Sequence, residues 1–426
     1  MKYVLPKGTF DILPEEPKEE NRWKESVRWN FLESTIRSLA RTYGYQEIRT
    51  PIFEQTDLFI RGVGETSDIV SKEMYIFQDK SKRSMSLRPE GTASVMRAFA
   101  TGQLQQLGNY HKFFYIGPFF RYDRPQAGRY RQFHQFGVEA IGNKDPEQDF
   151  ETIALLYHLY ETLGLKNLKV MVNCLGTAGC RETYKKELLA FLKPHFSSLS
   201  EESQVRFEKN PLRILDTKDP SENALLEKAP SILDFISEES KDRFRALCRL
   251  LEAEKLPFTV TPTLVRGLDY YNQTVFEITS DVLGAQNTIG AGGRYDGLLP
   301  AIGGPDLPCI GFSTGMERIL QTMAGQKISF PEREGPKVVF IPLSSEGKQR
   351  AFSCLNALRK AGISSELAPQ KKIQKALQFA DQLRATYAVI IGEEELKENH
   401  AQIKNMKSRE STTASFDTLV NYFGAH

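Results

Sequence analysis

The sequence predicts a mixed α/β protein with a separate α/β domain at its C-terminal end. Three observations carry this prediction: apolar runs flanking a basic loop at 113–142, a charged, helix-like segment at 176–255, and alternating strand and helix patterns after residue 336. The first is typical of an antiparallel hairpin and the last of a largely parallel sheet. We therefore expect a sheet-based N-terminal part with a helical insertion, followed by a smaller domain.

Composition narrows the class of protein. The 426 residues are 40% hydrophobic and 26% charged, with a net charge of +2, which suits two or three domains. Five scattered cysteines without a C-x-x-C pair predict neither a disulfide framework nor a zinc site, and therefore a reducing, cytoplasmic location. No apolar run has the length of a membrane span, and the N-terminus lacks a signal-peptide core.

The hairpin loop is a candidate anion site. Four arginines lie within eleven residues: Arg121, Arg124, Arg129 and Arg131. Pro125 and Gly128 mark the turn. A guanidinium offers a planar fork of donors and keeps its charge, which suits phosphate. The alternative is a solvated hairpin with a charged tip.

The second arm of the hairpin alternates in facing. Gln135, Gly137 and Glu139 share one side of the predicted strand, and Phe136 and Val138 share the other. An amide and a carboxylate are therefore expected to line one face of the sheet, which favours a binding site over a solvated tip.

The residues before the hairpin predict short elements around a long helix. After a turn at 7–11, apolar residues from 23 to 43 recur at helical spacing. A strand at 45–53 is interrupted by Pro51, which indicates an edge or an interface. Further elements are expected in order: strands at 74–78 and 85–87, and a helix at 93–100. Glu90 lies at the last strand-to-helix junction, where side chains reach a pocket.

The residues after the hairpin predict a helix at 150–163 and a strand at 168–172. The charged segment 176–255 follows, with prolines as breaks and no catalytic spacing, and we interpret it as a helical insertion. Strand patterns return at Phe258 and surround Arg266, Tyr270 and Tyr271, for which packing or a solvated position is the alternative to a binding role.

Two later stretches have the composition of ligand-binding segments. The glycines at 289–297 allow close backbone approach to a ligand, although a tight bend explains them equally well. The stretch 309–320 predicts a strand that runs into a helix, with Gly315 near its start. Arg318 in the first turns, with free backbone N–H groups, could meet a phosphate.

A polar linker at 328–336 precedes the C-terminal domain, Lys337–His426, which holds 13 basic and 9 acidic residues. Its first strand is followed by SSEG rather than G-x-G-x-x-G, so a dinucleotide fold is not supported. The basic excess of this domain, to which Lys371, Lys372 and Lys375 contribute, permits a nucleic-acid partner without demanding one.

Taken together, these stretches resemble the signatures of class II aminoacyl-tRNA synthetases. The helix and strand around Pro51 resemble the first signature, at the dimer interface, residues 119–139 the second and 311–318 the third. Leu264–Tyr271 (LVRGLDYY) and Ala291–Leu298 (AGGRYDGL) are similar to two peptides peculiar to the histidyl branch of that family. The resemblance covers nearly the whole chain.

The resemblance implies a domain plan. A six-stranded antiparallel catalytic sheet flanked by helices would occupy 1–327, with the helical insertion at 176–255 inside it. The linker at 328–336 would lead to an α/β anticodon-binding domain at 337–426, and the chain would form a homodimer.

The resemblance also implies two-step chemistry with L-histidine, ATP and tRNA(His) as substrates. The histidine carboxylate would attack the α-phosphate of ATP, and the terminal adenosine of the tRNA would then take the histidyl group. Arg121 would hold the α-phosphate, Arg318 the triphosphate end, and Arg266 would bridge the histidine carboxylate and the α-phosphate. Mg²⁺ would accompany the pyrophosphate, held by ligands that the sequence does not identify.

The implied histidine pocket follows from the donor and acceptor of a neutral imidazole. Glu139 would accept from one ring nitrogen and Tyr271 would address the other. The remaining contacts would come from the α-amino and carboxylate binders and from a closing aromatic: Glu90, Gly91, Thr92, Gln135 and Tyr270.

A rival interpretation is a catalytically inactive, histidine-sensing regulatory subunit or a synthetase-like binding module. Such proteins would be expected to lose the phosphate arginines or the C-terminal domain, whereas this chain keeps Arg121, Arg266, Arg318 and its α/β tail. A tail that serves only for dimerisation is a further alternative for that domain.

Overall fold

The computed structural model describes residues 3–64, 67–123, 128–217, 219–281, 287–370 and 372–425. Arg124, Pro125 and Lys371 lie outside the described residues. The chain forms two compact units, Met1–Phe330 and Pro331–His426. Within the described ranges, no helix combines the length and the apolar character that a membrane span requires.

The first unit is built on an eight-stranded sheet with the order β1-β5-β6-β11-β10-β9-β7-β8. The strands are β1 Gln46–Glu47, β5 His111–Phe120, β6 Gln132–Ile141, β7 Leu168–Cys174, β8 Thr259–Val260, β9 Asn272–Ser280, β10 Thr288–Arg294 and β11 Cys309–Gly315. The six inner strands pair antiparallel, as expected. The sheet has eight strands rather than the expected six, because β1 and β8, of two residues each, pair in parallel at its edges.

The predicted hairpin at 113–142 is confirmed as β5 and β6, paired along ten residues each from His111–Ile141 to Phe120–Gln132. Alternation then fixes the facing: Phe136 and Val138 are buried in the apolar core, whereas Gln135 and Glu139 lie on the opposite face with Gly137 between them.

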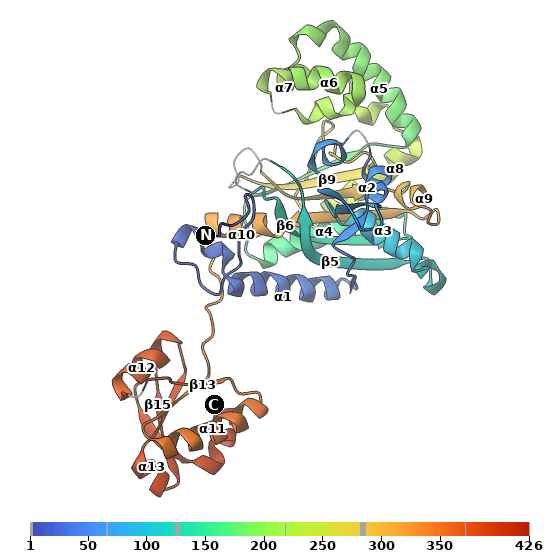
Figure 1. The fold of residues 1–426 in the computed structure, drawn as a ribbon. Coiled ribbons are helices and arrows are strands. Elements are labelled where there is room, and N and C mark those ends of the chain that lie inside the picture. Colours follow the sequence, from blue (N-terminus) through green and yellow to red (C-terminus); the bar gives the residue numbers. More distant parts are fainter. Residues whose placement is uncertain are drawn as a thin grey trace. The chain divides into compact units, whose positions relative to one another are not determined.

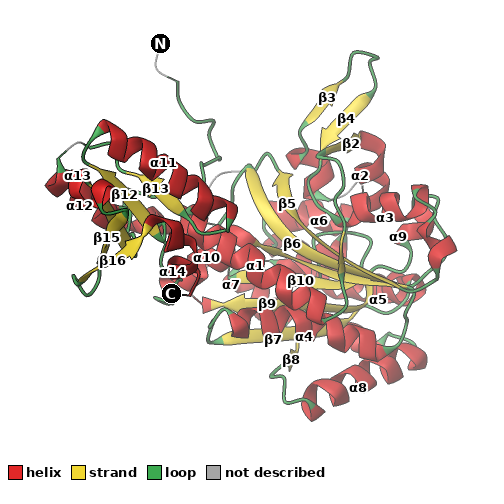
Figure 2. Cartoon of the chain, turned by 90° about the horizontal axis from the view of Figure 1, so that it is seen from below, coloured by secondary structure: helices red, strands yellow, loops and turns green. Residues whose placement is uncertain are grey.

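The strand expected at 45–53 is wrong in its extent. The chain leaves the large sheet after Glu47, passes Pro51 without pairing and enters a second sheet at Phe53. That sheet has the order β2-β4-β3, with the strands β2 Phe53–Gln55, β3 Ile76–Gln78 and β4 Ser84–Leu87. Proline cannot donate to a strand ladder, which explains the break at Pro51. Figure 2 shows β3 and β4 projecting as a hairpin.

Helices cover the core face of the large sheet. The helices of this unit outside the insertion are α1 Ser26–Thr42, α2 Thr56–Val63, α3 Thr92–Thr101, α4 Pro146–Thr162, α9 Leu298–Ala301 and α10 Met316–Gly325. α4 packs against β6, β9, β10 and β11, and α1 packs against α4 and α10 (Figure 1). Pro146 at the first position of α4 and acidic residues in its first turn favour a helix start there.

The charged segment 176–255 is helical, with α5 Ala178–Leu192, α6 Glu201–Lys209, α7 Pro220–Leu226 and α8 Glu238–Ala253. Each helix begins after a residue whose side chain accepts from a first-turn N–H: Thr177, Ser200, Asp219 and Ser237. These caps satisfy backbone donors that have no partner within the helix. Figure 1 shows α5, α6 and α7 in green, grouped together.

The second unit has a five-stranded sheet with the order β13-β12-β14-β15-β16. Its strands are β12 Val338–Pro342, β13 Ser365–Leu367, β14 Tyr387–Ile391, β15 His400–Asn405 and β16 Ser411–Ser415. Its helices are α11 Ser345–Lys360, α12 Ile373–Gln382, α13 Glu393–Lys397 and α14 Leu419–Ala425. The expectation of a mostly parallel sheet is wrong for half of its pairings, because β15 and β16 add an antiparallel hairpin to β14. The sheet is mixed.

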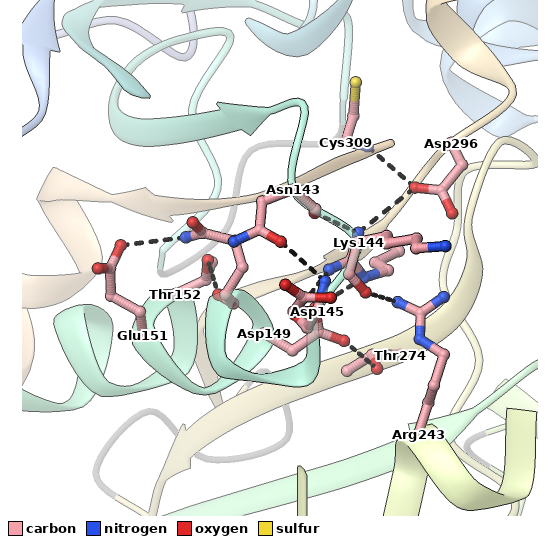
Figure 3. A network of polar contacts seen from close by, with 12 residues as sticks. Asn143, Lys144, Asp145, Asp149, Glu151, Thr152, Arg243, Thr274, Asp296 and Cys309 are labelled. Atoms are coloured by element: carbon pink, nitrogen blue, oxygen red, sulfur yellow. Dashed lines mark hydrogen bonds and ion pairs between the residues drawn. The ribbon is translucent and has the colours of Figure 1, made fainter. Parts of the chain in front are cut away.

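A buried charge network ties the large sheet to α4 (Figure 3). Arg294, at the end of β10, is 0% exposed, and its Nε donates to Oδ1 of Asp149 at 2.7 Å. Its remaining N–H groups donate to the carbonyls of Asn143 and Asp145 at 3.0 and 3.2 Å. Thr274 on β9 donates to the other oxygen of Asp149 at 2.6 Å. A buried ion pair is tolerated when its hydrogen bonds are satisfied in this way.

We expect Asp149→Ala to lower the free energy of unfolding by about 3 kcal/mol, because it leaves the buried guanidinium only the more distant carboxylate of Asp296, at 3.6 Å. Urea unfolding measures this loss. Asp242→Ala is the matched control, since it removes the partner of Arg245 in a pair whose side chains are 59% and 74% exposed, and should cost about 1 kcal/mol or less. Equal losses in the two variants would contradict the structural role of Asp149.

Candidate active site

A cavity of about 320 Å³ opens on the sheet face that carries Gln135. Its walls come from segments distant in sequence: the ends of the β5–β6 hairpin, β9, β10, β11 and the start of α10. The charged and amide side chains that line it are Glu73, Arg121, Asp123, Arg129, Gln135, Arg266, Glu277, Glu317 and Arg318. The cavity thus combines several fixed positive charges with carboxylates.

Backbone carbonyls hold two of these arginines in place. Nε of Arg121 donates to the carbonyl of Pro89 at 2.9 Å, and its guanidinium lies 5.3 Å from the ring centre of Phe133. Arg318 donates to the carbonyls of Gly128 and Thr288 at 3.1 and 2.6 Å. Carbonyl oxygens orient a guanidinium without neutralising it, so both side chains keep their positive charge in the cavity.

The electrostatics of the cavity favour an anion. Burial lowers the pKa of Arg121, and burial together with the nearby Arg129 and Arg121 lowers the pKa of Arg318. Arginine nevertheless stays protonated at any physiological pH. An anionic ligand would relieve both the repulsion among these cations and their loss of water.

Arg266 is held differently, by a carboxylate. It forms an ion pair with Glu277, which also accepts from Thr288 Oγ1 at 3.0 Å. Burial opposes the charge of Arg266, but Glu277 together with the nearby Tyr271, Tyr270 and Asp216 outweighs burial, and the pKa of Arg266 is raised. In the described part of the chain, Nε of Arg266 and Oε1 of Gln135 are buried without a hydrogen-bond partner. A donor and an acceptor left open in one cavity indicate a polar ligand.

A second cluster surrounds the buried carboxylate of Glu139, which is 0% exposed. Thr92 Oγ1 donates to Oε1 at 2.8 Å, and the hydroxyl of Tyr295 donates to Oε2. Burial raises the pKa of Glu139 to about 8, against the opposing effect of these two donors. Glu90 accepts from the backbone N–H of Thr92 and of Ala93, both at 2.8 Å, and thereby caps α3.

Aromatic rings enclose this cluster. Tyr270 lies 4.7 Å from Tyr271 and 5.5 Å from Tyr295, measured between ring centres. Tyr115 fills the space beside Gly91 and Gly137, where a Cβ at either position would overlap its ring. Glycine at both positions therefore leaves room for the ring of Tyr115, which projects from β5 between Gly137 on β6 and Gly91 at the start of α3.

The structure brings the sequence-derived candidates into two adjoining groups. Arg121, Gln135, Arg266 and Arg318 line the cavity. Glu90, Gly91, Thr92, Glu139, Tyr270 and Tyr271 form the buried cluster. The groups join at Tyr271, whose ring centre lies 5.8 Å from the Arg266 guanidinium, and along β6, which carries Gln135 and Glu139 on one face.

Sequence reasoning missed residues that complete the site. Glu277 pairs with Arg266, Tyr295 donates to Glu139, and Tyr115 lies between the two glycines. Tyr295 could have been inferred from the sequence, because it lies within the AGGRYDGL peptide. Glu277 and Tyr115 carry no such signal, since each lies in an apolar strand pattern.

Comparisons with known proteins agree on one family. The family model described as histidyl-tRNA synthetase matches residues 8–319, and the one described as anticodon binding domain matches 337–426. The chain is 54% identical to the histidine–tRNA ligase of Protochlamydia amoebophila and 45% identical to that of Anoxybacillus flavithermus, each over 99% of both chains. The crystal structure of apo Staphylococcus aureus histidyl-tRNA synthetase superposes with a TM-score of 0.83 at 37% identity, covering 99% of this chain and 100% of that one.

The antiparallel sheet with arginines over one face defines a class II aminoacyl-tRNA synthetase, as the three signatures implied. Within that class, the chain belongs to the histidyl-tRNA synthetase family.

The raised pKa of Glu139 makes stability depend on pH. Because its folded value is about 8 against a usual 4.5, the folded protein keeps a proton there that the unfolded chain has released. The stability from this group is fully present below about pH 4.5 and is lost as pH rises through about 8.

We therefore expect the free energy of unfolding of the wild type to fall with pH between about pH 5 and pH 8 more steeply than that of Glu139→Gln, by up to ~1.4 kcal/mol per pH unit. The amide keeps the size and an acceptor for Thr92 but does not titrate. Urea unfolding of both proteins across this range measures the two slopes. Identical slopes would show that the carboxyl group is ionised in the folded state.

Proposed function

We propose that this protein is a histidine–tRNA ligase, which activates L-histidine with ATP and transfers it to the 3′-terminal adenosine of tRNA(His), releasing AMP and pyrophosphate. One observation carries the proposal: a cavity lined by half-buried arginines adjoins a cluster of polar and aromatic side chains around the buried carboxylate of Glu139. The first suits a nucleotide phosphate and the second a small polar side chain. The family of the chain supports the same activity.

Activation needs no protein nucleophile, because the carboxylate of histidine itself attacks the α-phosphate. The difficulty is electrostatic, since two anions must meet as negative charge builds on the phosphate. Arg121 would bind the α-phosphate, Arg318 the far end of the triphosphate, and Arg266 would bridge the phosphate and the attacking carboxylate. Fixed donors of this kind act by positioning and by stabilising charge in the transition state.

In the free protein Arg266 is paired with Glu277. For Arg266 to reach the substrates, its open Nε, or a guanidinium released from Glu277, must point into the cavity. Glu277 would then hold the arginine at the correct position before the substrates arrive, which reduces the reorganisation that catalysis requires.

The pocket around Glu139 would select the imidazole ring. Glu139 would accept from one ring nitrogen and Tyr271 would address the other, while Tyr270 would close the pocket. Gln135 has an open acceptor for the α-amino group. Glu90, with Gly91 and Thr92, would form the same end of the pocket, although Glu90 also caps α3. A site that leaves polar groups unpaired with a wrong substrate discriminates strongly.

The donor set is compatible with Mg²⁺ held mainly by phosphate. Among the described residues, no three His, Cys, Asp or Glu side chains gather to form a protein-only metal site. Magnesium typically uses one or two carboxylates together with substrate phosphates. Glu73 and Glu277 line the cavity and would supply those ligands. The ion would neutralise charge on the phosphate oxygens.

We also propose a cytoplasmic homodimer. The small sheet exposes large apolar side chains at Phe53, Ile76 and Phe77, which are 52%, 54% and 42% exposed. A cluster of exposed apolar side chains is typical of an interaction surface, and this one lies beside the Pro51 segment that resembles the dimer signature. The five cysteines are free, which suits a reducing compartment.

The test of the activity is ATP–pyrophosphate exchange that depends on histidine. We expect Arg266→Ala to slow histidine-dependent exchange by about 10²–10³-fold with little change in the KM for ATP, because its charge is needed as the transition state forms. Arg409→Ala, which removes an exposed arginine paired with Asp381, should leave the exchange unchanged. Exchange that is absent from the wild type, with histidine binding retained, would favour the regulatory subunit instead.

Selection of tRNA should be separable from activation, because the cavity lies in the first unit and the anticodon-binding match in the second. A fragment ending at Phe330 should retain histidine-dependent exchange and lose most tRNA charging. The salt dependence of tRNA binding should also weaken, because phosphate contacts from residues such as Lys372 and Lys375 are removed. A folded fragment that charges tRNA with an unchanged salt slope would refute the anticodon-binding assignment.

A further inference from the structure

The helical insertion contacts the segment that carries three proposed site residues. We call residues 264–271, which include Arg266, Tyr270 and Tyr271, the tyrosine segment. This segment lies between β8 and β9 and is in neither strand. Its position therefore depends on packing and on individual hydrogen bonds rather than on a strand ladder.

Two side chains of the insertion bond to the tyrosine segment. Arg181 on α5 donates to the backbone carbonyl of Tyr271. Asn210, at the end of α6, donates through Nδ2 to Oδ1 of Asp269 at 3.0 Å. The insertion therefore bonds to the two residues that flank Tyr270 in the sequence, Asp269 and Tyr271.

A third contact connects the insertion to a neighbouring part of the cavity wall. Arg213 donates to Oδ2 of Asp68 at 2.7 Å, with the two side chains 13% and 40% exposed. Burial works against ionisation of Asp68, but Arg213 outweighs it and the pKa of Asp68 is lowered. Asp68 directly precedes the helical turn Ile69–Glu73, and Glu73 lines the cavity.

These two contacted stretches also touch each other. The backbone N–H of Asp269 donates to the carbonyl of Val63 at 3.3 Å. Leu268 packs against the apolar cluster formed by Phe59, Val63 and Ile69. The insertion therefore bonds both to the tyrosine segment and to the stretch at Asp68, and these two contact each other. Tyr270 and Tyr271 of the tyrosine segment belong to the cluster around Glu139.

We propose that Arg181, Asn210 and Arg213 are positioning residues, through which the helical insertion holds the tyrosine segment in place and sets the affinity of the pocket for histidine. This inference rests on the proposed function. A segment without its own strand ladder loses conformational freedom when ligand binds, so contacts that order it beforehand increase affinity. The insertion acts on the histidine pocket rather than on the triphosphate end, where Arg318 is bonded to Gly128 and Thr288.

The experiment is histidine-dependent ATP–pyrophosphate exchange with the full-length chain carrying Arg213→Gln, Asn210→Ala or both. Each single change should raise the KM for histidine by about tenfold, while the KM for ATP stays within about twofold. Arg213→Lys, which retains the charge opposite Asp68, should restore most of the histidine affinity. Hydrogen exchange of backbone amides should become faster in 264–271 in Arg213→Gln and stay unchanged in β11.

A double-mutant cycle tests whether Arg213 acts on the pocket through Asp68. Asp68→Asn should have much the same effect as Arg213→Gln, and the combined variant should be no worse than Asp68→Asn, because both changes remove the Arg213–Asp68 pair. Asp68→Asn also removes a contact with Lys72 at 3.7 Å, which is exposed and contributes little. Arg245→Gln is the matched control: it removes an arginine of the same insertion that pairs with Asp242 away from the tyrosine segment, and should change neither KM.

Folding is checked by thermal unfolding of every variant. The inference is overturned if folded Arg213→Gln and Asn210→Ala bind histidine as the wild type does, or if the KM values for histidine and ATP rise together. Failure of the proposed function is distinguishable, because the wild type itself would then show no histidine-dependent exchange.

Discussion

The structure and its candidate site both depend on the free-energy cost of removing charged side chains from water. In the body of the fold the cost is offset by the protein itself: Arg294 has the carboxylates of Asp149 and Asp296 and two carbonyls around it. In the cavity it is offset only in part, since Arg121 and Arg318 rest on carbonyl oxygens. The same desolvation cost therefore has two outcomes: Arg294 forms a structural ion-pair network, whereas the cavity arginines form a site that favours an anion.

Three glycines leave room for the buried cluster around Glu139. Glu139 and Tyr115 need room on the face of the sheet, and glycines at 91, 137 and 311 provide it, because a Cβ at any of these positions would meet one of the two side chains. The apolar face of the same strands packs against α4. Each strand thus serves the core with one face and the pocket with the other.

Elements with a strong apolar period could be predicted from the sequence. The β5–β6 hairpin, α1, α4 and the passage from β11 into α10 lie where the pattern placed them. The β15–β16 hairpin was not predicted, because β16, Ser411–Ser415, contains no large apolar side chain and is largely exposed. The residues at 45–53 were assigned to one strand because sequence pattern cannot show that the two ends pair in different sheets.

By itself, the sequence determined the family of this protein, the order of most of its elements and most of the candidates for its site, because signature peptides keep chemistry-bearing side chains at fixed spacings along strands and turns. Only the tertiary structure decided which of those side chains meet. Glu277 on β9 meets Arg266 of the preceding loop, and Tyr295 reaches Glu139 on a strand that is distant in sequence. The contacts of Arg213 with Asp68 and of Asn210 with Asp269 follow the same rule, because the partner of a polar side chain is set by tertiary packing, which local sequence pattern does not encode.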